Sequence, residues 1–201
     1  MFARLFASAL LATLLPLNVC VAQTNGSNSS LPQPREAAAN PQPPKSAAPQ
    51  PEAVLRPSDT ASLLPPAVFY RGQSGTVQSR NSGGVRFADG ALMLATLVDT
   101  SGYSSTVTQK YQAYLLTEVP LAIGGHSLPP GAYGFGFIAG NKFVLMDIGG
   151  HDLLTATYDH DSVLRRPTPL QVLPSEAAGQ YRLCSGRNYV TFSRAGPSTQ
   201  K

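Results

Sequence analysis

Histidines beside paired glycines are the residues of this sequence that come nearest to a metal site. Ile123-Gly124-Gly125-His126 recurs 25 residues later as Ile148-Gly149-Gly150-His151, and His160 follows between Asp159 and Asp161. Imidazole and carboxylate groups bind zinc when loops bring several of them together. The spacing matches no zinc signature. We therefore favour histidines exposed in loops, and we keep His126, His151 and His160 as metal candidates.

Asp147 and Glu118 are the acidic residues that could take part in acid–base chemistry. Asp147 lies within the apolar run of residues 143–148, where burial would raise the pKa of its carboxyl group. Paired with Glu118, it would form an acid–base couple. The chain has no G-x-S-x-G elbow, phosphate loop or dinucleotide fingerprint. We therefore identify no catalytic residue and expect no cofactor, and Asp147 is expected to meet a hydrogen-bond donor at the end of its strand.

Only two cysteines are present, Cys20 and Cys184. If Cys20 is removed or lipidated, Cys184 is left alone, and the fold has no internal disulfide. A lone cysteine in a strand is more often a small buried hydrophobic residue than a reactive thiol. We expect that structural role for Cys184.

The first 22 residues predict a signal peptide. Arg4 precedes an apolar run, residues 5–17, which is too short to span a bilayer and has the length of a signal-peptide core. Small residues at Cys20 and Ala22 predict cleavage after Ala22. The alternative is lipidation of Cys20, since Leu17-Asn18-Val19-Cys20 partly matches a lipobox. We expect a periplasmic or extracellular protein, with membrane attachment only if Cys20 is lipidated.

Residues 23–65 predict a disordered linker rich in Pro, Ala, Gln and Ser. Their few large apolar residues cannot offset the entropy lost on ordering, and proline favours an extended conformation.

The basic residues of the chain are spread singly, apart from Arg165-Arg166. This dispersion argues against nucleic-acid binding, which needs clustered cations.

Residues 66–195 predict one antiparallel β domain of about ten strands, followed by a flexible tail, residues 196–201. Short runs of apolar and β-branched residues alternate with turns at Asp89-Gly90, Gly140-Asn141, Gly149-Gly150 and Ser185-Gly186. We favour a β-sandwich and keep a partly closed barrel as the alternative. Strand alternation would place Tyr133, Phe135 and Phe137 towards the core, and Gly134 and Gly136 on the opposite face.

Ile123–Gly134 resembles a segment of uncharacterised secreted bacterial β-sandwich proteins. In these proteins an apolar strand, a Leu-Pro-x-Gly-x-Tyr-Gly turn and a new strand follow one another, as they do here through Val144. The resemblance implies a sandwich of unknown function and carries over no catalytic residue.

Export, the linker and the lack of a catalytic motif favour a non-catalytic module of the cell envelope. Its partner would be an envelope protein or a glycan. The alternatives are a secreted hydrolase or metal-dependent enzyme, which needs convergent side chains, and a small-ligand carrier, which needs an apolar cavity.

Overall fold

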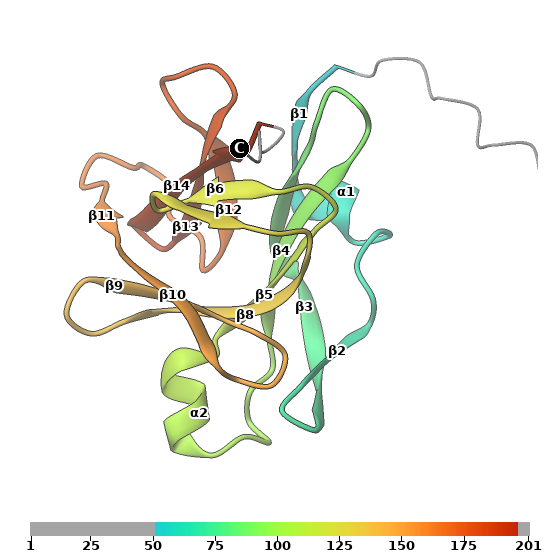
Figure 1. The fold of residues 1–201 in the computed structure, drawn as a ribbon, viewed down its shortest axis with the longest axis vertical. Coiled ribbons are helices and arrows are strands. Elements are labelled where there is room, and N and C mark those ends of the chain that lie inside the picture. Colours follow the sequence, from blue (N-terminus) through green and yellow to red (C-terminus); the bar gives the residue numbers. More distant parts are fainter. Residues whose placement is uncertain (1–50, 197–201) are drawn as a thin grey trace, which may run out of the picture. The chain divides into compact units, whose positions relative to one another are not determined.

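The computed structural model describes residues 51–196, which form two antiparallel β-sheets and two short helices (Figure 1). In chain order the elements are β1 (Ala53–Leu55), α1 (Pro57–Thr60), β2 (Ala67–Tyr70), β3 (Gln73–Arg86), β4 (Leu92–Val98), α2 (Ser105–Lys110), β5 (Ala113–Thr117), β6 (Leu121–Ile123), β7 (His126–Leu128), β8 (Gly131–Ile138), β9 (Lys142–Met146), β10 (Asp152–Thr157), β11 (Asp159–His160), β12 (Gln171–Pro174), β13 (Gln180–Ser185) and β14 (Asn188–Arg194). The predicted signal peptide, including Cys20 and Ala22, lies outside these residues. Between residues 51 and 196 no helix is long and apolar enough to cross a membrane.

The strands form an eight-stranded sheet and a six-stranded sheet. The larger has the order β1-β3-β4-β5-β8-β9-β10, with β2 paired to the other half of β3, and the smaller has the order β12-β13-β14-β6-β7, with β11 paired to β14. The long strand β3 shifts register between Gln78 and Ser82, so that one half pairs with β2 and the other with β1. The two antiparallel sheets confirm the predicted all-β class. Within the described part neither sheet closes into a barrel.

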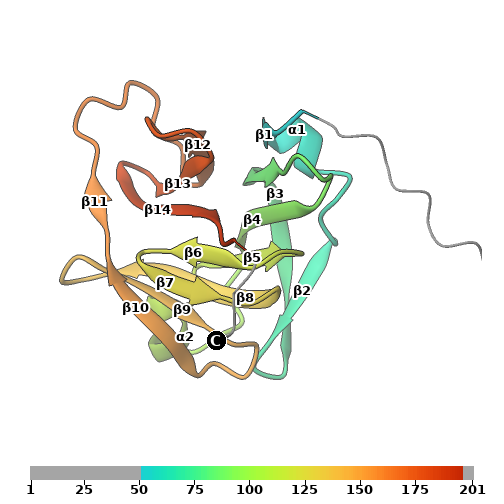
Figure 2. The same ribbon diagram turned by 45° about the horizontal axis from the view of Figure 1, so that its top comes forward.

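The main hydrophobic core lies between the two sheets. Met93 and Leu115 of the larger sheet and Leu121, Leu183 and Phe192 of the smaller sheet belong to one cluster, and each is at most 1% exposed. Buried apolar surface of this kind is the dominant stabilising contribution in a small domain without cross-links. Figure 2 shows the two sheets facing each other, with β10 and β11 passing from one to the other.

The four hairpin turns predicted from sequence are all present. They join β3 to β4, β8 to β9, β9 to β10 and β13 to β14. At Gly140-Asn141 both central residues have positive φ angles, 77° and 61°. Two consecutive positive φ angles are what a type I′ turn requires, and glycine and asparagine adopt them more readily than other residues. The strands outnumber the expected ten because several two- to four-residue strands, such as β7 and β11, carry too little pattern to be recognised.

The aromatic stripe of β8 faces the core as expected. Tyr133 and Phe135 are buried between the sheets, and Phe137 packs against the same cluster. On the opposite face, a Cβ atom at Gly134 would lie 2.8 Å from the Tyr70 ring, and one at Gly136 would meet the main chain at Lys110. The glycines therefore admit another part of the same chain.

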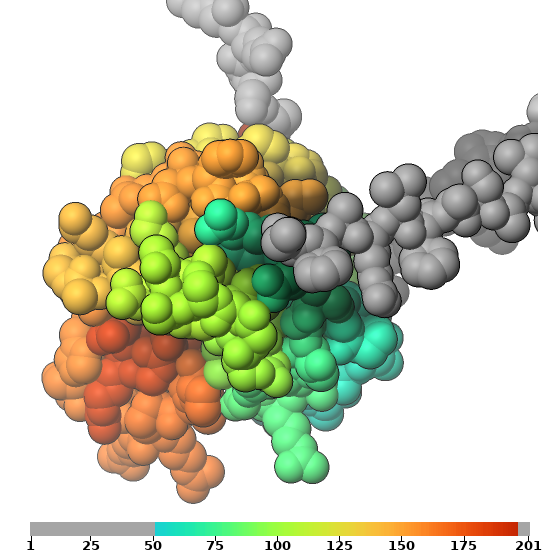
Figure 3. Space-filling model, turned by 90° about the horizontal axis from the view of Figure 1, so that it is seen from below, coloured from blue at the N-terminus to red at the C-terminus, as the bar shows by residue number. Residues whose placement is uncertain are grey.

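A second apolar cluster covers the outer face of the larger sheet, where α2 lies (Figure 3). The rings of Tyr70 and Tyr111 stack there with centroids 3.8 Å apart, and Tyr103 meets both edge-on. Burial raises the pKa of Tyr111, whose hydroxyl has no hydrogen-bond partner among the described residues.

The fold begins earlier than the sequence predicted. β1 pairs with β3, Leu55 is 4% exposed, and the Thr60 hydroxyl lies 2.6 Å from the Ser82 hydroxyl in a buried contact. Residues 53–64, assigned from composition to the linker, therefore belong to the β domain. Only three apolar side chains anchor this segment, Leu55, Leu64 and the half-buried Val54, which is too sparse a pattern to stand out among prolines.

Candidate functional site

The three histidines singled out as metal candidates lie on different elements and have different partners. His126 begins β7 and is exposed. His151 contacts Asp147, and the Nδ1 atom of His160 lies 2.9 Å from Oδ1 of Asn188. Among residues 51–196 no three His, Cys, Asp or Glu side chains are grouped so that they could hold a metal ion. The Gly-Gly-His repeats therefore do not form the metal site considered above.

Asp147 and His151 form a pair at the turn between β9 and β10. The carboxylate accepts hydrogen bonds from the His151 amide and from its Nδ1 atom, each 2.9 Å long. These two bonds lower the pKa of Asp147, so the raised pKa expected from its apolar neighbours is wrong. The strand ends before Asp147, which leaves the carboxylate in a polar turn. The pair orients the imidazole as in a catalytic dyad, but the ring is 81% exposed.

Glu118 does not approach Asp147 as an acid–base partner. Its Oε2 atom accepts a hydrogen bond of 2.8 Å from the Leu92 amide, so it closes the start of β4.

Cys184 has the structural role expected of it. Its side chain is 2% exposed, and burial raises the pKa of the thiol to about 11.

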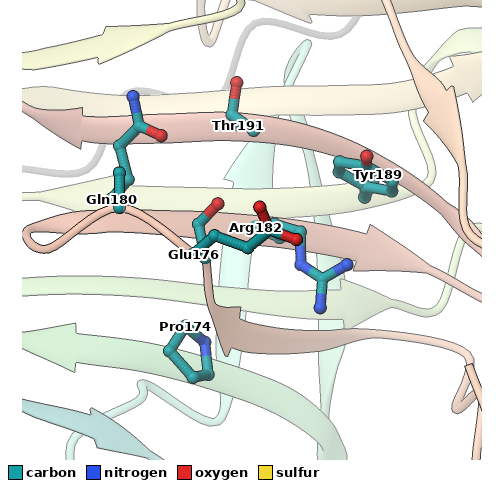
Figure 4. A pocket seen from close by; sticks show the side chains of 8 residues that line it. Pro174, Glu176, Gln180, Arg182, Tyr189 and Thr191 are labelled. Atoms are coloured by element: carbon teal, nitrogen blue, oxygen red, sulfur yellow. The ribbon is translucent and has the colours of Figure 1, made fainter.

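A concave polar surface lies on the outer face of the smaller sheet, over β13 and β14. Alternation directs Tyr181 and Leu183 into the core and Gln180 and Arg182 to the opposite face. Arg182 lies opposite Thr191 on the neighbouring strand. The loop between β12 and β13 adds residues from one side. Figure 4 shows Gln180, Arg182, Tyr189 and Thr191 on two adjacent strands, with Glu176 extending from the loop.

Arg182 is held in place by two different contacts. Its Nη1 atom donates a hydrogen bond of 2.8 Å to Oδ2 of Asp161, and its guanidinium lies 5.1 Å from the centre of the Tyr189 ring. The chain around Asp161 is anchored by Arg187, whose Nη1 atom donates to the carbonyl oxygens of Asp161 and Ser162. An arginine fixed in this way presents a rigid wall.

The resulting pocket has a volume of about 480 Å³, within the range of small-molecule sites. We call it the sheet pocket. Its lining residues are Pro174, Ser175, Glu176, Ala177, Gln180, Arg182, Tyr189 and Thr191. Hydroxyl, amide, carboxylate and guanidinium groups alternate around it, so that donors and acceptors are mixed.

The charges around the sheet pocket argue against a strongly anionic ligand. Asp161 neutralises Arg182, while Glu176 has no ion-pair partner between residues 51 and 196. The pocket thus offers one uncompensated negative charge together with neutral polar groups. This combination suits a ligand with many hydroxyl groups better than a phosphate or a nucleic acid.

Sequence reasoning missed every residue of this pocket. Alternation over 180–194 could have shown which side chains point outwards. It could not show that the loop at Glu176 rises beside them, or that Asp161, 21 residues away, pairs with Arg182. These relations depend on the path of the chain between strands.

Comparison with known proteins assigns no family: no family model, no curated protein and no solved structure matches this chain.

Proposed function

We propose that this protein is an exported, non-catalytic module of the cell envelope, and that its β domain binds a glycan in the sheet pocket. The observation that carries the proposal is the concave outer face of β13 and β14, with its mixed hydrogen-bonding groups. Sugar hydroxyls both donate and accept, so they match a surface on which Gln180, Thr191 and Glu176 alternate in these roles. The aromatic ring of Tyr189 adds an apolar wall.

The pre-organisation of Arg182 supports binding at this place. A long side chain loses rotamer freedom when it binds a ligand, and this loss weakens binding. Asp161 and Tyr189 already restrain Arg182. The side chain of Arg182 is therefore already ordered in the folded protein, and ligand binding does not have to order it.

Glycan binding is tested by titration calorimetry of the purified protein against soluble fragments of bacterial envelope glycans. Gln180→Ala and Thr191→Val each remove a polar group from the pocket without touching the core. We expect each to weaken binding about fivefold, the effect of one hydrogen bond. Ser193→Ala is the matched control, because Ser193 is opposite Gln180 but does not line the pocket.

Two results would contradict the proposal. The first is that no fragment binds. The second is that a fragment binds equally well to the parent and to both pocket variants, which would place its site elsewhere.

Export is the other half of the proposal, and it has its own measurement. The intact mass of the protein recovered from the periplasm or medium distinguishes cleavage after Ala22 from lipidation at Cys20. We propose cleavage, which predicts a mass that starts at unmodified Gln23. A mass that starts at Cys20 with attached acyl chains would make the protein a tethered module.

A further inference from the structure

Strand β10 is the outermost strand of the eight-stranded sheet, and one of its edges is unpaired within the described part of the chain (Figure 2). Tyr158 donates its amide hydrogen to Asn141, and the register pairs Ala156 with Phe143 and Leu154 with Leu145. Hydrogen bonds of antiparallel strands alternate along the chain. The amide and carbonyl groups of Thr155 and Thr157 therefore point away from β9, towards the open edge.

This edge is longer than the others, and a register shift between Asp152 and Leu154 leaves a bulge at its start. β10 has six residues, whereas β1, β2, β7 and β12 have three or four. β12 also runs close to β3, since a Cβ atom at Gly83 would lie 2.9 Å from the Val172 nitrogen. Proteins normally guard free edges with lysine, proline or short strands. Residues 153–157 of β10, Leu-Leu-Thr-Ala-Thr, contain no charge and no proline.

The surroundings of β10 are also open to a partner. Leu153 is 51% exposed and Ile148, in the preceding turn, is 52% exposed. Asp152 at the start of the strand is neutralised by Lys110, whose Nζ atom lies 2.6 Å away. Figure 3 shows this segment, in orange, at the surface beside α2. An approaching strand therefore meets exposed apolar side chains at this end of β10, with the side chain of Arg71 packed beside the turn at Gly150.

We propose that β10 pairs antiparallel with β10 of a second copy of this chain, with Thr155 at the two-fold axis. In this register Thr155 exchanges two hydrogen bonds with its own counterpart, and the regular part of the strand, residues 154–157, lies next to the axis. On the core side, Leu154 faces Ala156 of the second copy, so a large side chain meets a small one twice. The strand is thus complementary to itself, the condition for a two-fold interface.

The size of this contact sets the expected strength. Pairing of five or six residues through one strand buries less than the roughly 1,200 Å² typical of stable complexes. The dimer is therefore weak and forms only at high protein concentration. It joins two eight-stranded sheets into one continuous sheet and leaves both sheet pockets accessible, since these lie on the smaller sheet.

The test is sedimentation velocity of the mature protein over concentrations from about 1 to about 500 µM, a range chosen for an interface of this size. We expect the mean mass to rise from monomer towards dimer. Thr155→Pro removes an amide donor that has no partner among residues 51–196, so it is tolerated at an edge. It removes both central hydrogen bonds and raises the dissociation constant about 30-fold.

A second variant acts by charge and has a matched control. Thr155→Lys brings two ammonium groups together at the axis and abolishes the dimer. Ser127→Lys places the same charge on the exposed edge strand β7 of the other sheet and leaves the dimer unchanged. Cooperative thermal unfolding of each variant shows that it is folded.

A parent protein that stays monomeric throughout this range overturns the proposal, and β10 is then an edge for a different partner or for none. A dimer that persists in Thr155→Lys, or that Ser127→Lys removes, also overturns it, because the interface then lies elsewhere.

Discussion

Arg182 Nη1 and Asp161 Oδ2 lie 2.8 Å apart, in side chains that are only 25% and 13% exposed. The pair joins β13 to the chain that follows β11, and its arginine lines the sheet pocket. It thus links the stability of the smaller sheet to the shape of the candidate site.

Replacing Asp161 by Asn should destabilise the protein and weaken ligand binding together. The variant leaves the half-buried guanidinium of Arg182 without a counter-charge, which costs more than the pair itself contributes. We expect the thermal midpoint to fall by a few degrees, as measured by calorimetry. Asp159→Asn is the control, because Asp159 is exposed on the two-residue strand β11. Equal midpoints for the two variants would show that the ion pair contributes nothing.

The same variant should lose part of the acid sensitivity of the parent. Desolvation alone would raise the pKa of Asp161, but hydrogen bonds from Arg182 and the Val163 amide outweigh it, so that the pKa is lowered. A lowered pKa contributes stability above the unfolded-state value of about 4 and loses it as the pH falls through the folded-state value. Below about pH 4, the stability difference between the parent and Asp161→Asn should therefore shrink. Urea unfolding at several pH values measures it.

Leu55 tests whether the segment before residue 66 belongs to the fold. Leu55→Ala should lower the free energy of unfolding by about 2–4 kcal/mol, because the side chain is buried beside Leu64 and Leu94. Leu63→Ala is a matched control in the same segment, since Leu63 is 41% exposed. Its cost should be about 0.5 kcal/mol. If residues 51–65 were an unstructured linker, neither change would alter denaturant unfolding.

Gly136 tests the close approach between β8 and the end of α2. Gly136→Ala places a methyl group against the main chain at Lys110 and should cost about 1–3 kcal/mol or more, because backbone cannot move aside cheaply. Gly102→Ala is the control, because the atom nearest to its Cβ position is a side-chain atom of Gln73, 3.7 Å away. Similar unfolding midpoints for the two variants would argue against the tight packing of α2 on the sheet.

Cys184 should be unreactive in the folded protein. Its thiol is buried, and with a pKa near 11 it stays protonated at pH 8. We expect iodoacetamide to alkylate Cys184 only after denaturant is added. The measurement is the mass of the peptide that contains Cys184. Rapid labelling without denaturant would mean that the smaller sheet opens readily, or that Cys184 has the reactive role set aside above.

The sequence alone determined the all-β class, the hairpin turns and the inward face of β8. Each of these is local. Gly140-Asn141 selects its turn through its own φ preferences, and Tyr133, Phe135 and Phe137 share a face because side chains alternate along any strand. The burial of Cys184 was also predicted, as that of a small uncharged residue in a strand, although alternation places it on the outer face of the sheet with Arg182.

Only the tertiary structure decided where the fold begins and which side chains meet. Leu55 lies among prolines in sequence, but pairing of β1 with β3 supplies the partners that bury it. The two Gly-Gly-His turns look alike in sequence. His126 nevertheless belongs to a hairpin of the smaller sheet and His151 to a hairpin of the larger sheet, and the local pattern cannot reveal this difference. Arg182 joins Asp161 across 21 residues, because β11 and β13 both border β14. Contacts between distant segments depend on the path of the whole chain, so no local periodicity encodes them.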